Sequence, residues 1–265
     1  MKTYLFIDLS YFIFYLYYSK KKYLQCQKKY LQCQYLETTD LINNEYFMSL
    51  FNNFDKKLEE IKKKLKLKDN KKIIFAKDCK RNDIWRNELF PEYKKNRKVN
   101  NEVGEFFIHT YKNIIHKYNY INVDKCEADD IIGVLTKELY KDNKIYIITG
   151  DMDYLQLLYN ENIQIYDLKY NNFREKSIGY KDDLLKKIIL GDISDNIPSI
   201  HKKLGAKTVD KYLNNKEELQ NKLKDPLIKQ QFILNQKLID MNFIPINFIK
   251  NILQIFKEKK YNNNI

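Results

Sequence analysis

Seven carboxylates of this chain lie where apolar runs end or where an apolar helical pattern begins. They are Asp8, Asp78, Asp151 and Asp153, which end apolar runs, and Glu127, Asp129 and Asp130, which open the pattern CEADDIIG. The runs predict buried strands of a parallel sheet, whose carboxyl ends share one edge, so we expect these side chains to converge there. Crowded carboxylates repel one another unless a cation lies among them, and their hard oxygen atoms favour Mg²⁺.

A single surface carboxylate is usually a solvated charge or a helix cap. Asp129 and Asp130, for example, would also favour the positive end of a helix dipole. The joint placement of the acids after several apolar runs argues for a common site instead. Clusters of this size serve two-metal phosphoryl chemistry, in which divalent ions acidify an attacking water and stabilise the attacking and leaving oxygens.

The charge of the chain favours a polyanionic partner. The 265 residues carry a net charge of +13, with a pI near 9.2. An AT-rich genome would also inflate the lysine content, so the bulk charge does not decide the function. Arginine is less affected by such a bias, because the chain holds only four arginines and three of them, Arg81, Arg86 and Arg97, lie in one short segment. A planar guanidinium suits bidentate phosphate contacts.

Composition excludes several classes of protein. A hydrophobic fraction of 44% with 14% aromatic residues excludes a disordered chain, and no run is long enough to span a membrane. The sequence opens on a strand-like run, so we expect no signal peptide. The four cysteines form no CxxC pair and have no nearby histidine, which argues against a disulfide framework or a zinc site and predicts a reducing, intracellular compartment.

Apolar patterns predict alternating strands and helices up to about residue 180, and helices beyond it. The expected strands cover residues 3–8, 73–78, 120–124, 144–150 and 163–168. The expected helices run to about residue 18 and over 41–66, 105–118, 127–140, 151–158 and most of 181–265. This order predicts an α/β core with a mostly parallel central sheet flanked by helices in residues 1–180, and a helical subdomain in residues 181–265.

Two segments between these elements stand out. KKYLQCQ occurs twice in tandem from residue 21, which is too short for a solenoid and indicates an enlarged surface loop over residues 19–38. Residues 79–104 hold few apolar residues and many charges, and Pro91 ends any helix early. This stretch therefore predicts an exposed excursion from the core.

Four motifs in a fixed order resemble a known family. ELFPEYKKNR, CEADD, TGDMDYLQL and GDISDNIP are similar to motifs of the 5′-nucleases, the flap endonucleases and 5′–3′ exonucleases of bacteria, phages and large DNA viruses. The resemblance covers residues 1–18 and 73 to about 212, and QQFILNQKLIDM at 230–241 extends it. It implies a PIN-like core, a helical arch over residues 79–104 and a helix-turn-helix in the C-terminal subdomain. It favours a phage- or virus-type enzyme that stands alone without a polymerase domain.

The resemblance also implies roles for the acids. The first of two Mg²⁺ ions, for which Mn²⁺ can substitute, would be held by Asp8, Asp78, Glu127 and Asp129, with Asp130 close by. The second would be held by Asp151 and Asp153, together with Asp192 and Asp195 of GDISD. The metal site would then be shared between the sheet and the helical part of the chain.

The basic segment YKKNRK has two interpretations. It is either a solvated charged loop, as such runs usually are, or, as the resemblance implies, part of the arch. In the arch, Lys94 and Arg97 match the residues that reach the scissile phosphate and stabilise its charge. Arg86 and Lys95 would contact DNA phosphates. Tyr93 would stack on an unpaired base or anchor the arch to the core.

A second basic element, IPSIHKKLGAKTVDKY, precedes and opens a helical pattern. Gly205 lies just before the helix, where free backbone N–H groups bind phosphate, and Lys202, Lys203 and Lys207 would contribute to duplex binding. By resemblance this is the helix-turn-helix that grips DNA, often with a K⁺ ion. The sequence departs from the family pattern at Ser199, where glycine is usual, and in a turn that is one residue longer, which puts the K⁺ site in doubt.

These observations predict a Mg²⁺-dependent, structure-specific 5′-nuclease with flap endonuclease and 5′–3′ exonuclease activities in DNA replication and repair. Expected substrates are 5′-flap, nicked or gapped DNA and RNA–DNA primer hybrids, and the expected products carry 5′-phosphates. We expect a monomer in the cytoplasm or at a site of viral or phage DNA replication, working alone or beside a replicative polymerase or clamp.

Three alternatives remain open on the sequence. A PIN-like ribonuclease shares the acidic core, although it does not need the second basic element or the GDISD acids. A non-catalytic DNA-binding protein of the same fold would have lost acids. A merely lysine-rich binder would show salt-sensitive affinity without preference for junctions.

Overall fold

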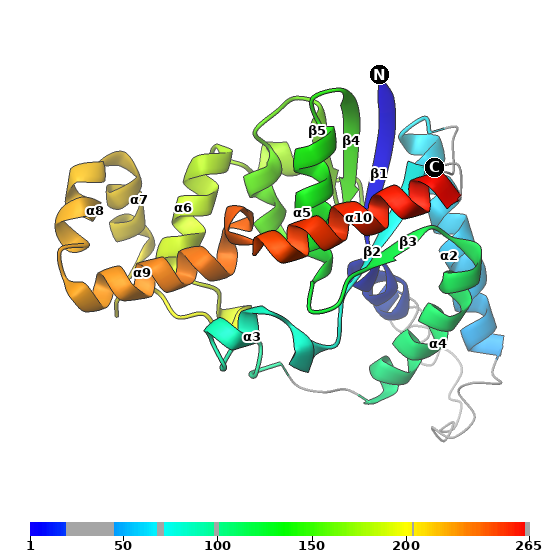
Figure 1. Ribbon diagram of the computed structural model, residues 1–265, viewed down its shortest axis with the longest axis horizontal. Helices are drawn as coiled ribbons and strands as arrows, with labels where there is room; N and C mark the ends of the chain where they lie inside the picture. Colours follow the sequence, from blue (N-terminus) through cyan, green and yellow to red (C-terminus); the bar gives the residue numbers. More distant parts are fainter. Residues whose placement is uncertain (20–44, 68–71, 98–100, 203, 263–265) are drawn as a thin grey trace, which may run out of the picture.

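The computed structural model describes residues 1–19, 45–67, 72–97, 101–202 and 204–262 (Figure 1). A five-stranded sheet with the order β3-β2-β1-β4-β5 forms its centre. Its strands are β1 (Lys2–Asp8), β2 (Ile73–Lys77), β3 (Tyr120–Asn122), β4 (Asn143–Ile148) and β5 (Ile163–Tyr166). All pairings between these strands are parallel, so the predicted α/β class is confirmed.

Strand β1 lies at the centre of the sheet, between β2 and β4. Leu5 pairs with Ile73 on one side and with Tyr146 on the other. The chain therefore extends the sheet first in one direction and then, from β4, in the other. A crevice at the carboxyl ends of the strands forms where the strand order reverses in this way, and ligands bind there in open α/β sheets.

Helices cover both faces of the sheet. Tyr4 and Phe6 point to a core shared with α5 (Ala128–Leu139) and α10 (Ile246–Asn262), which lie in front of the sheet in Figure 1. Leu5 and Ile7 point to the opposite face, where the helix over residues 9–19, α2 (Glu45–Lys64) and α4 (Asn101–Lys117) pack. Successive side chains of a strand alternate between faces, and a strand buried on both sides reads as the continuous apolar run seen in β1.

A helical part extends beyond the sheet, on the left of Figure 1. It contains α6 (Tyr180–Leu190), α7 (Ala206–Asn214), α8 (Lys216–Lys222) and α9 (Pro226–Ile239). Ile189, Val209 and Leu219 form a small core of their own. Helix α10 then returns to the sheet, where Phe256 packs edge-on against Tyr4. The last helix of the predicted DNA-binding subdomain thus packs on the α/β core.

Most of residues 79–97 are exposed, as expected for an excursion, but a few of their side chains are buried. The segment forms η3 (Arg81–Asp83) and α3 (Arg86–Leu89), which ends before Pro91 as predicted. Ile84 and Tyr93 are buried against Ile188 of α6 and Leu238 of α9. These few apolar side chains reach the junction between the core and the helical part, and their burial holds the otherwise exposed segment there.

Some predictions lie outside the described residues. They are the tandem KKYLQCQ repeat with most of the expected loop 19–38, residues 98–100 of the expected arch, and Lys203. Among the helices that are described, none is long and apolar enough to cross a membrane.

Candidate active site

Asp8 and Asp78 lie at the carboxyl ends of the two central strands, and backbone and hydroxyl groups orient both. Asp8 ends β1 and accepts hydrogen bonds from Tyr11 N at 3.0 Å and Thr149 Oγ1 at 3.2 Å. Asp78 follows β2 and accepts a 2.8 Å hydrogen bond from Ala128 N. The first turn of α5 and the turn after β4 therefore position these two carboxylates.

The motif CEADD places three further acids at the start of α5. Carboxylate oxygens of Glu127, Asp129 and Asp130 lie within 4.8 Å of one another. Asp130 is fully buried and accepts hydrogen bonds from Glu127 N at 2.9 Å and Trp85 Nε1 at 3.0 Å. The carboxylate of Asp130 thus fixes the start of α5 and leaves Glu127 and Asp129 as the outer members of the cluster.

Arg86 is buried behind this cluster, which corrects the expected DNA contact. Its side chain is 2% exposed. Nε donates to Leu238 O at 2.8 Å, Nη2 to Asp130 Oδ1 at 2.8 Å, and Nη1 to Glu127 Oε2 and Asp130 Oδ2, each at 3.0 Å. A guanidinium held in this way neutralises buried acids and joins α3, α5 and α9. Arg86 is not presented to a surface phosphate.

Tyr93 anchors the arch segment to the acids. The residue is 4% exposed, and its hydroxyl donates to Glu127 Oε2 at 2.9 Å and to Asp195 Oδ2 at 3.2 Å. Of the two roles expected for Tyr93, this position is that of an anchor, because a buried ring offers no face to a base.

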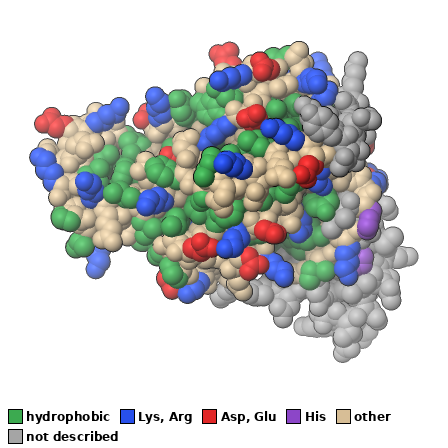
Figure 2. All heavy atoms as spheres, in the orientation of Figure 1, with side chains coloured by type: hydrophobic (Ala, Val, Ile, Leu, Met, Phe, Trp, Pro, Cys, Tyr) green, Lys and Arg blue, Asp and Glu red, His purple; other side chains and the backbone are tan. Residues whose placement is uncertain are grey.

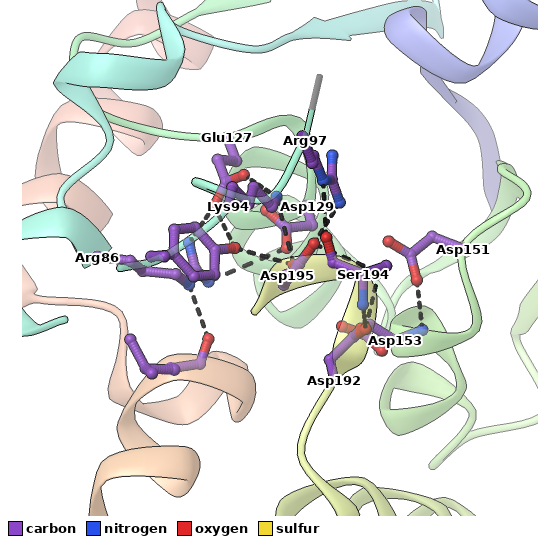
Figure 3. Close-up of polar contacts among 12 residues, drawn as sticks. Arg86, Lys94, Arg97, Glu127, Asp129, Asp151, Asp153, Asp192, Ser194 and Asp195 are labelled. Atoms are coloured by element: carbon purple, nitrogen blue, oxygen red, sulfur yellow. Dashed lines mark hydrogen bonds and ion pairs between the residues drawn. The ribbon is translucent and has the colours of Figure 1, made fainter. Parts of the chain in front are cut away.

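Lys94 and Arg97 bring the arch segment to the GDISD acids, as Figure 3 shows. Lys94 Nζ pairs with Glu127 and lies 3.5 Å from Asp195 Oδ2. Arg97 pairs with Asp195 through Nη2 and donates from Nε to Ser194 O at 3.1 Å. Lys95 points away, is 60% exposed and pairs with Glu92 at 2.9 Å. The structure therefore gathers Lys94 and Arg97 with the acids and leaves Lys95 at the surface.

A second group of acids forms beside η4 (Met152–Leu157) and η6 (Ile193–Asp195). Asp151 is the N-cap residue of η4 and accepts a 2.9 Å hydrogen bond from Asp153 N. Asp192 begins η6 and accepts from Ser194 N at 2.7 Å. Figure 3 shows Asp151, Asp153 and Asp192 on the other side of Asp195 from Glu127. The acids of the sheet edge and of GDISD thus meet at one rim.

Gly191 makes the turn that returns Asp192 to this rim. Its φ of +69° is rare for residues with a side chain, and a Cβ atom would come within 2.4 Å of Ile197 O and Pro198 O. Asn235, fully buried in α9, donates to Ile188 O at 2.9 Å and Pro198 O at 2.8 Å. These two hydrogen bonds of Asn235 hold the GDISD turn against the helical part.

Lys187 is a site residue that the sequence analysis missed. Its ammonium lies 2.6 Å from Asp153 Oδ1 and 2.5 Å from Asp192 Oδ2. A lysine in the last turn of a helix that leads directly into an acidic turn was the available signal. Sequence order alone does not reveal that Asp153, far away along the chain, lies against the same ammonium.

The pKa values of the carboxylates are shifted in different directions. Burial, with the charge of Asp78, raises the pKa of Asp8 to about 7, and burial, with the charge of Asp151, raises the pKa of Asp153 to about 7. Burial also acts to raise the pKa of Glu127, but the charges of Lys94 and Arg86 outweigh it and hold that pKa below its usual range. Acids whose ionisation is disfavoured in this way call for additional positive charge.

The donor set fits divalent ions. The gathered atoms are carboxylate oxygens, the hard ligands that ions such as Mg²⁺ and Mn²⁺ take. One group of these acids contains Glu127 and Asp129, and the other contains Asp153 and Asp192. Within the described residues, the positive charges that pair with these acids belong to Lys94, Arg97 and Lys187 and to the buried Arg86.

The predicted duplex-binding residues lie apart from the acids. Gly205 precedes α7, with open space where a Cβ would be, and Lys202 and Lys207 are exposed on either side of it. In Figure 2, lysine and arginine side chains are spread over the helical part as well as the core. Neither the DNA contacts of these residues nor the K⁺ site is tested by this arrangement, and both stay predictions.

Comparisons with known proteins show the family of the chain. The family model described as the 5′–3′ exonuclease N-terminal resolvase-like domain matches residues 3–187. A 5′–3′ exonuclease of Mycoplasmopsis pulmonis is 30% identical over 205 residues, 71% of this chain and 67% of the relative. Ribonuclease H of Enterobacteria phage T4 is 28% identical over 75% of this chain and 73% of the relative.

A 5′–3′ exonuclease of Buchnera aphidicola is 36% identical over 168 residues, which is 59% of this chain but only 57% of that relative. Among solved structures, the bacteriophage T5 flap endonuclease in a pseudo-enzyme–product complex with DNA and metal ions superposes with a TM-score of 0.65 at 13% identity, covering 97% of this chain and 99% of the other. This likeness supports the fold. The match covers residues 3–187 and so includes three of the four motifs, ELFPEYKKNR, CEADD and TGDMDYLQL, and it confirms the resemblance in family: the chain belongs to the 5′–3′ exonuclease family.

Proposed function

We propose that this chain is a Mg²⁺-dependent, structure-specific 5′-nuclease, in which Mn²⁺ can replace Mg²⁺. Its substrates would be 5′-flap, nicked or gapped DNA and RNA–DNA primer hybrids, cut to leave 5′-phosphate and 3′-hydroxyl ends. The observation that carries the proposal is the meeting of acids from the sheet edge and from GDISD beside Lys94 and Arg97.

Two sets of side chains would hold the ions. The first set is Asp8, Asp78, Glu127 and Asp129, and the second is Asp151, Asp153, Asp192 and Asp195. Asp130 would serve the first set indirectly, because its carboxylate is committed to Arg86 and to the start of α5. When bound, the ions would acidify a water molecule and stabilise the charge that develops on the phosphate oxygens.

Lys94 and Arg97 would bind the scissile phosphate. Both are held at the rim by Glu127 and Asp195, and both can turn to a phosphate oxygen once those carboxylates coordinate ions. Burial acts to lower the pKa of Lys94, but the charges of Glu127 and Asp195 have the larger, opposite effect. The pKa therefore lies above its usual value, and the ammonium stays charged. Its role would be electrostatic stabilisation of the transferring phosphate.

The helical part would bind the duplex beside the cut. The N-terminal end of α7, with Gly205, Lys202 and Lys207, offers free backbone N–H groups and positive charge to a phosphate. The T5 relative was crystallised with DNA, and the phage T4 relative is named a ribonuclease H. These two names support DNA branches and RNA–DNA hybrids as substrates. The protein would act as a monomer where DNA is replicated, beside a polymerase or clamp.

A cleavage assay tests the proposal and its rivals. The purified protein would be given a labelled 5′-flap duplex, a nicked duplex, an RNA–DNA hybrid and single-stranded RNA, each with Mg²⁺, Mn²⁺ or EDTA. Cutting of the flap near the junction with either ion, and none in EDTA, is the expected result. Preference for single-stranded RNA would favour a PIN-like ribonuclease. Tight flap binding without cutting under any condition would indicate a non-catalytic DNA-binding protein.

A further inference from the structure

A cavity of about 250 Å³ lies between η4 and α6, next to the second group of acids. It shares two residues with that group, because Asp153 and Lys187 line the cavity as well as the metal-binding rim. Any ligand that fills the cavity would therefore touch the phosphate-processing site at one end. We call this cavity the η4–α6 pocket.

The walls of the pocket are mostly apolar. Met152 and Leu155 of η4 face Leu184 of α6, Ile239 of α9 contributes to the lining, and Ile178 lies before α6. Met152 is 40% exposed and Ile178 is 57% exposed. Apolar side chains exposed around a concavity lose contact with water when a ligand covers them, which favours an occupant with apolar faces.

Two uncharged or acidic side chains of the pocket, Gln156 and Asp183, are already engaged within the protein. Gln156 Nε2 donates to Asp153 O at 2.8 Å and to Ile239 O at 3.1 Å, and its Oε1 accepts from Met241 N at 2.8 Å. The carboxylate of Asp183 accepts from Ser177 and from Ile178 N. The occupant would thus be held by its faces rather than read by its hydrogen-bonding edge.

Three lysines line the same pocket. Lys176, Lys186 and Lys187 supply positive charge against Asp153 and Asp183, which suits a ligand that combines a flat apolar group with a nearby phosphate. A nucleotide has that composition, and aliphatic walls can cover the apolar faces of any base. An apolar peptide side chain would fill the walls but would bring no negative charge to these lysines.

We propose that the η4–α6 pocket binds one unpaired base of the substrate, that of a nucleotide adjacent to the scissile phosphate. The inference rests on the proposed nuclease function and adds a subsite to it. The pocket would accept any of the bases, because its walls are mostly apolar and the polar atoms of Gln156 and Asp183 are committed to other groups. It would also favour a nucleotide that is already unpaired, since extruding a paired base from a duplex costs free energy.

The test combines a protein change with a substrate change. A series of flap substrates is made, each with a single abasic site. That site is placed in turn at each of the two nucleotides on either side of the cut. Cleavage by the parent and by Ile178→Ser is compared, and Ile246→Ser, a similarly exposed change on α10 at 64% exposure, is the matched control. KM and kcat are measured for every combination.

The expected result is a penalty that depends on the pocket. At one position the abasic site should raise KM of the parent by roughly fivefold or more. Ile178→Ser should raise KM for the intact flap and lose most of its response to that abasic site, whereas Ile246→Ser should behave as the parent. As a second measurement, 2-aminopurine at the same position should change fluorescence on binding in EDTA, and Ile178→Ser should weaken that change.

Three results would overturn the subsite alone, and one other concerns the enzyme as a whole. Equal abasic penalties in the parent and Ile178→Ser at every position would show that no base occupies the pocket. An unaltered 2-aminopurine signal in Ile178→Ser would show the same. If the parent cuts no flap at all, the nuclease function fails together with the subsite. If the parent cuts the intact flap normally, and the effects of Ile178→Ser and of the abasic site are independent of each other, only the subsite fails.

Discussion

Lys187 Nζ lies 2.6 Å from Asp153 Oδ1, although the lysine belongs to the helical part and the acid to η4 beside the sheet. The same ammonium lies 2.5 Å from Asp192 Oδ2. A single side chain thus supplies positive charge between two acids proposed to hold the second ion. Burial acts to lower the pKa of Lys187, but the charges of Asp153 and Asp192 raise it, so the ammonium persists at neutral pH.

Lys187→Met should strengthen binding of the second divalent ion. The change removes a positive charge that the ion must displace or approach, so we expect an apparent Kd for Mn²⁺ lower by roughly tenfold. Calorimetric titration and electron paramagnetic resonance of Mn²⁺ in the absence of DNA would measure it. Lys186→Met, which removes the same charge from an exposed neighbour, is the control. Equal affinities in parent and Lys187→Met would show that the lysine does not compete with the ion.

Asp151→Asn should abolish cleavage while DNA binding largely persists. The amide keeps the shape of the side chain and its hydrogen bond from Asp153 N but lacks the charge that an ion requires. Single-turnover cleavage of a 5′-flap and binding to the same flap in EDTA would separate the two effects. Glu161→Gln, an exposed change, controls for the lost charge. Cutting at the parent rate by Asp151→Asn would remove this residue from the metal site.

Lys94→Ala should slow the chemical step by about two orders of magnitude, with a smaller effect on duplex binding. The ammonium lies among Glu127 and Asp195, where a charge aimed at the transferring phosphate acts in a partly desolvated site. Single-turnover rates and flap affinity would be compared with those of Lys94→Arg, which keeps the charge and should recover part of the rate. An unchanged single-turnover rate in Lys94→Ala would exclude the residue from the mechanism.

Arg86→Met should destabilise the fold rather than weaken DNA binding alone. It leaves Asp130, which is fully buried, without its ion-pair partner, and breaking a buried pair on one side costs about 3–5 kcal/mol. Urea denaturation would report the free energy of unfolding, with the exposed Arg81→Met as control. A loss below about 1 kcal/mol, together with weaker flap binding, would instead restore the DNA contact that the sequence suggested.

The metal-free protein should lose stability as pH rises from about 4 to 7. The pKa of Asp8 is near 3.8 in an unfolded chain and about 7 in the fold. Between those values the folded state binds more protons than the unfolded state, so the free energy of unfolding falls with increasing pH and levels off above 7. Asp153 acts in the same direction.

Asp8→Asn should therefore stabilise the metal-free protein at pH 8 by about 1–3 kcal/mol and flatten this slope. Thermal unfolding in EDTA across the pH range would measure both effects. Asp142→Asn, which removes an exposed carboxylate, matches the change in charge. A parallel pH dependence in parent and Asp8→Asn would contradict the assignment.

The strands and the acids at their ends could be predicted from the sequence. The apolar runs that become β1, β2 and β4 are continuous because a parallel strand is buried on both faces. The acids that follow them share one edge because the carboxyl ends of parallel strands lie on the same side of the sheet. The capping acids of α5 and the order of the motifs needed no coordinates either. Such signals are local, since each depends on residues close together in the chain.

The partners of these acids were decided by the tertiary structure. Arg86 reads as a surface arginine in a charged segment, yet packing of Ile84 and Tyr93 at the junction carries it into the interior. There, ion pairs with Glu127 and Asp130 offset its desolvation. Lys187 reads as one lysine among many, yet the turn at Gly191 folds Asp192 back toward it and toward Asp153. Charge pairing between distant segments depends on where the whole chain places them, because the Coulomb energy follows distance in space and burial rather than separation in sequence.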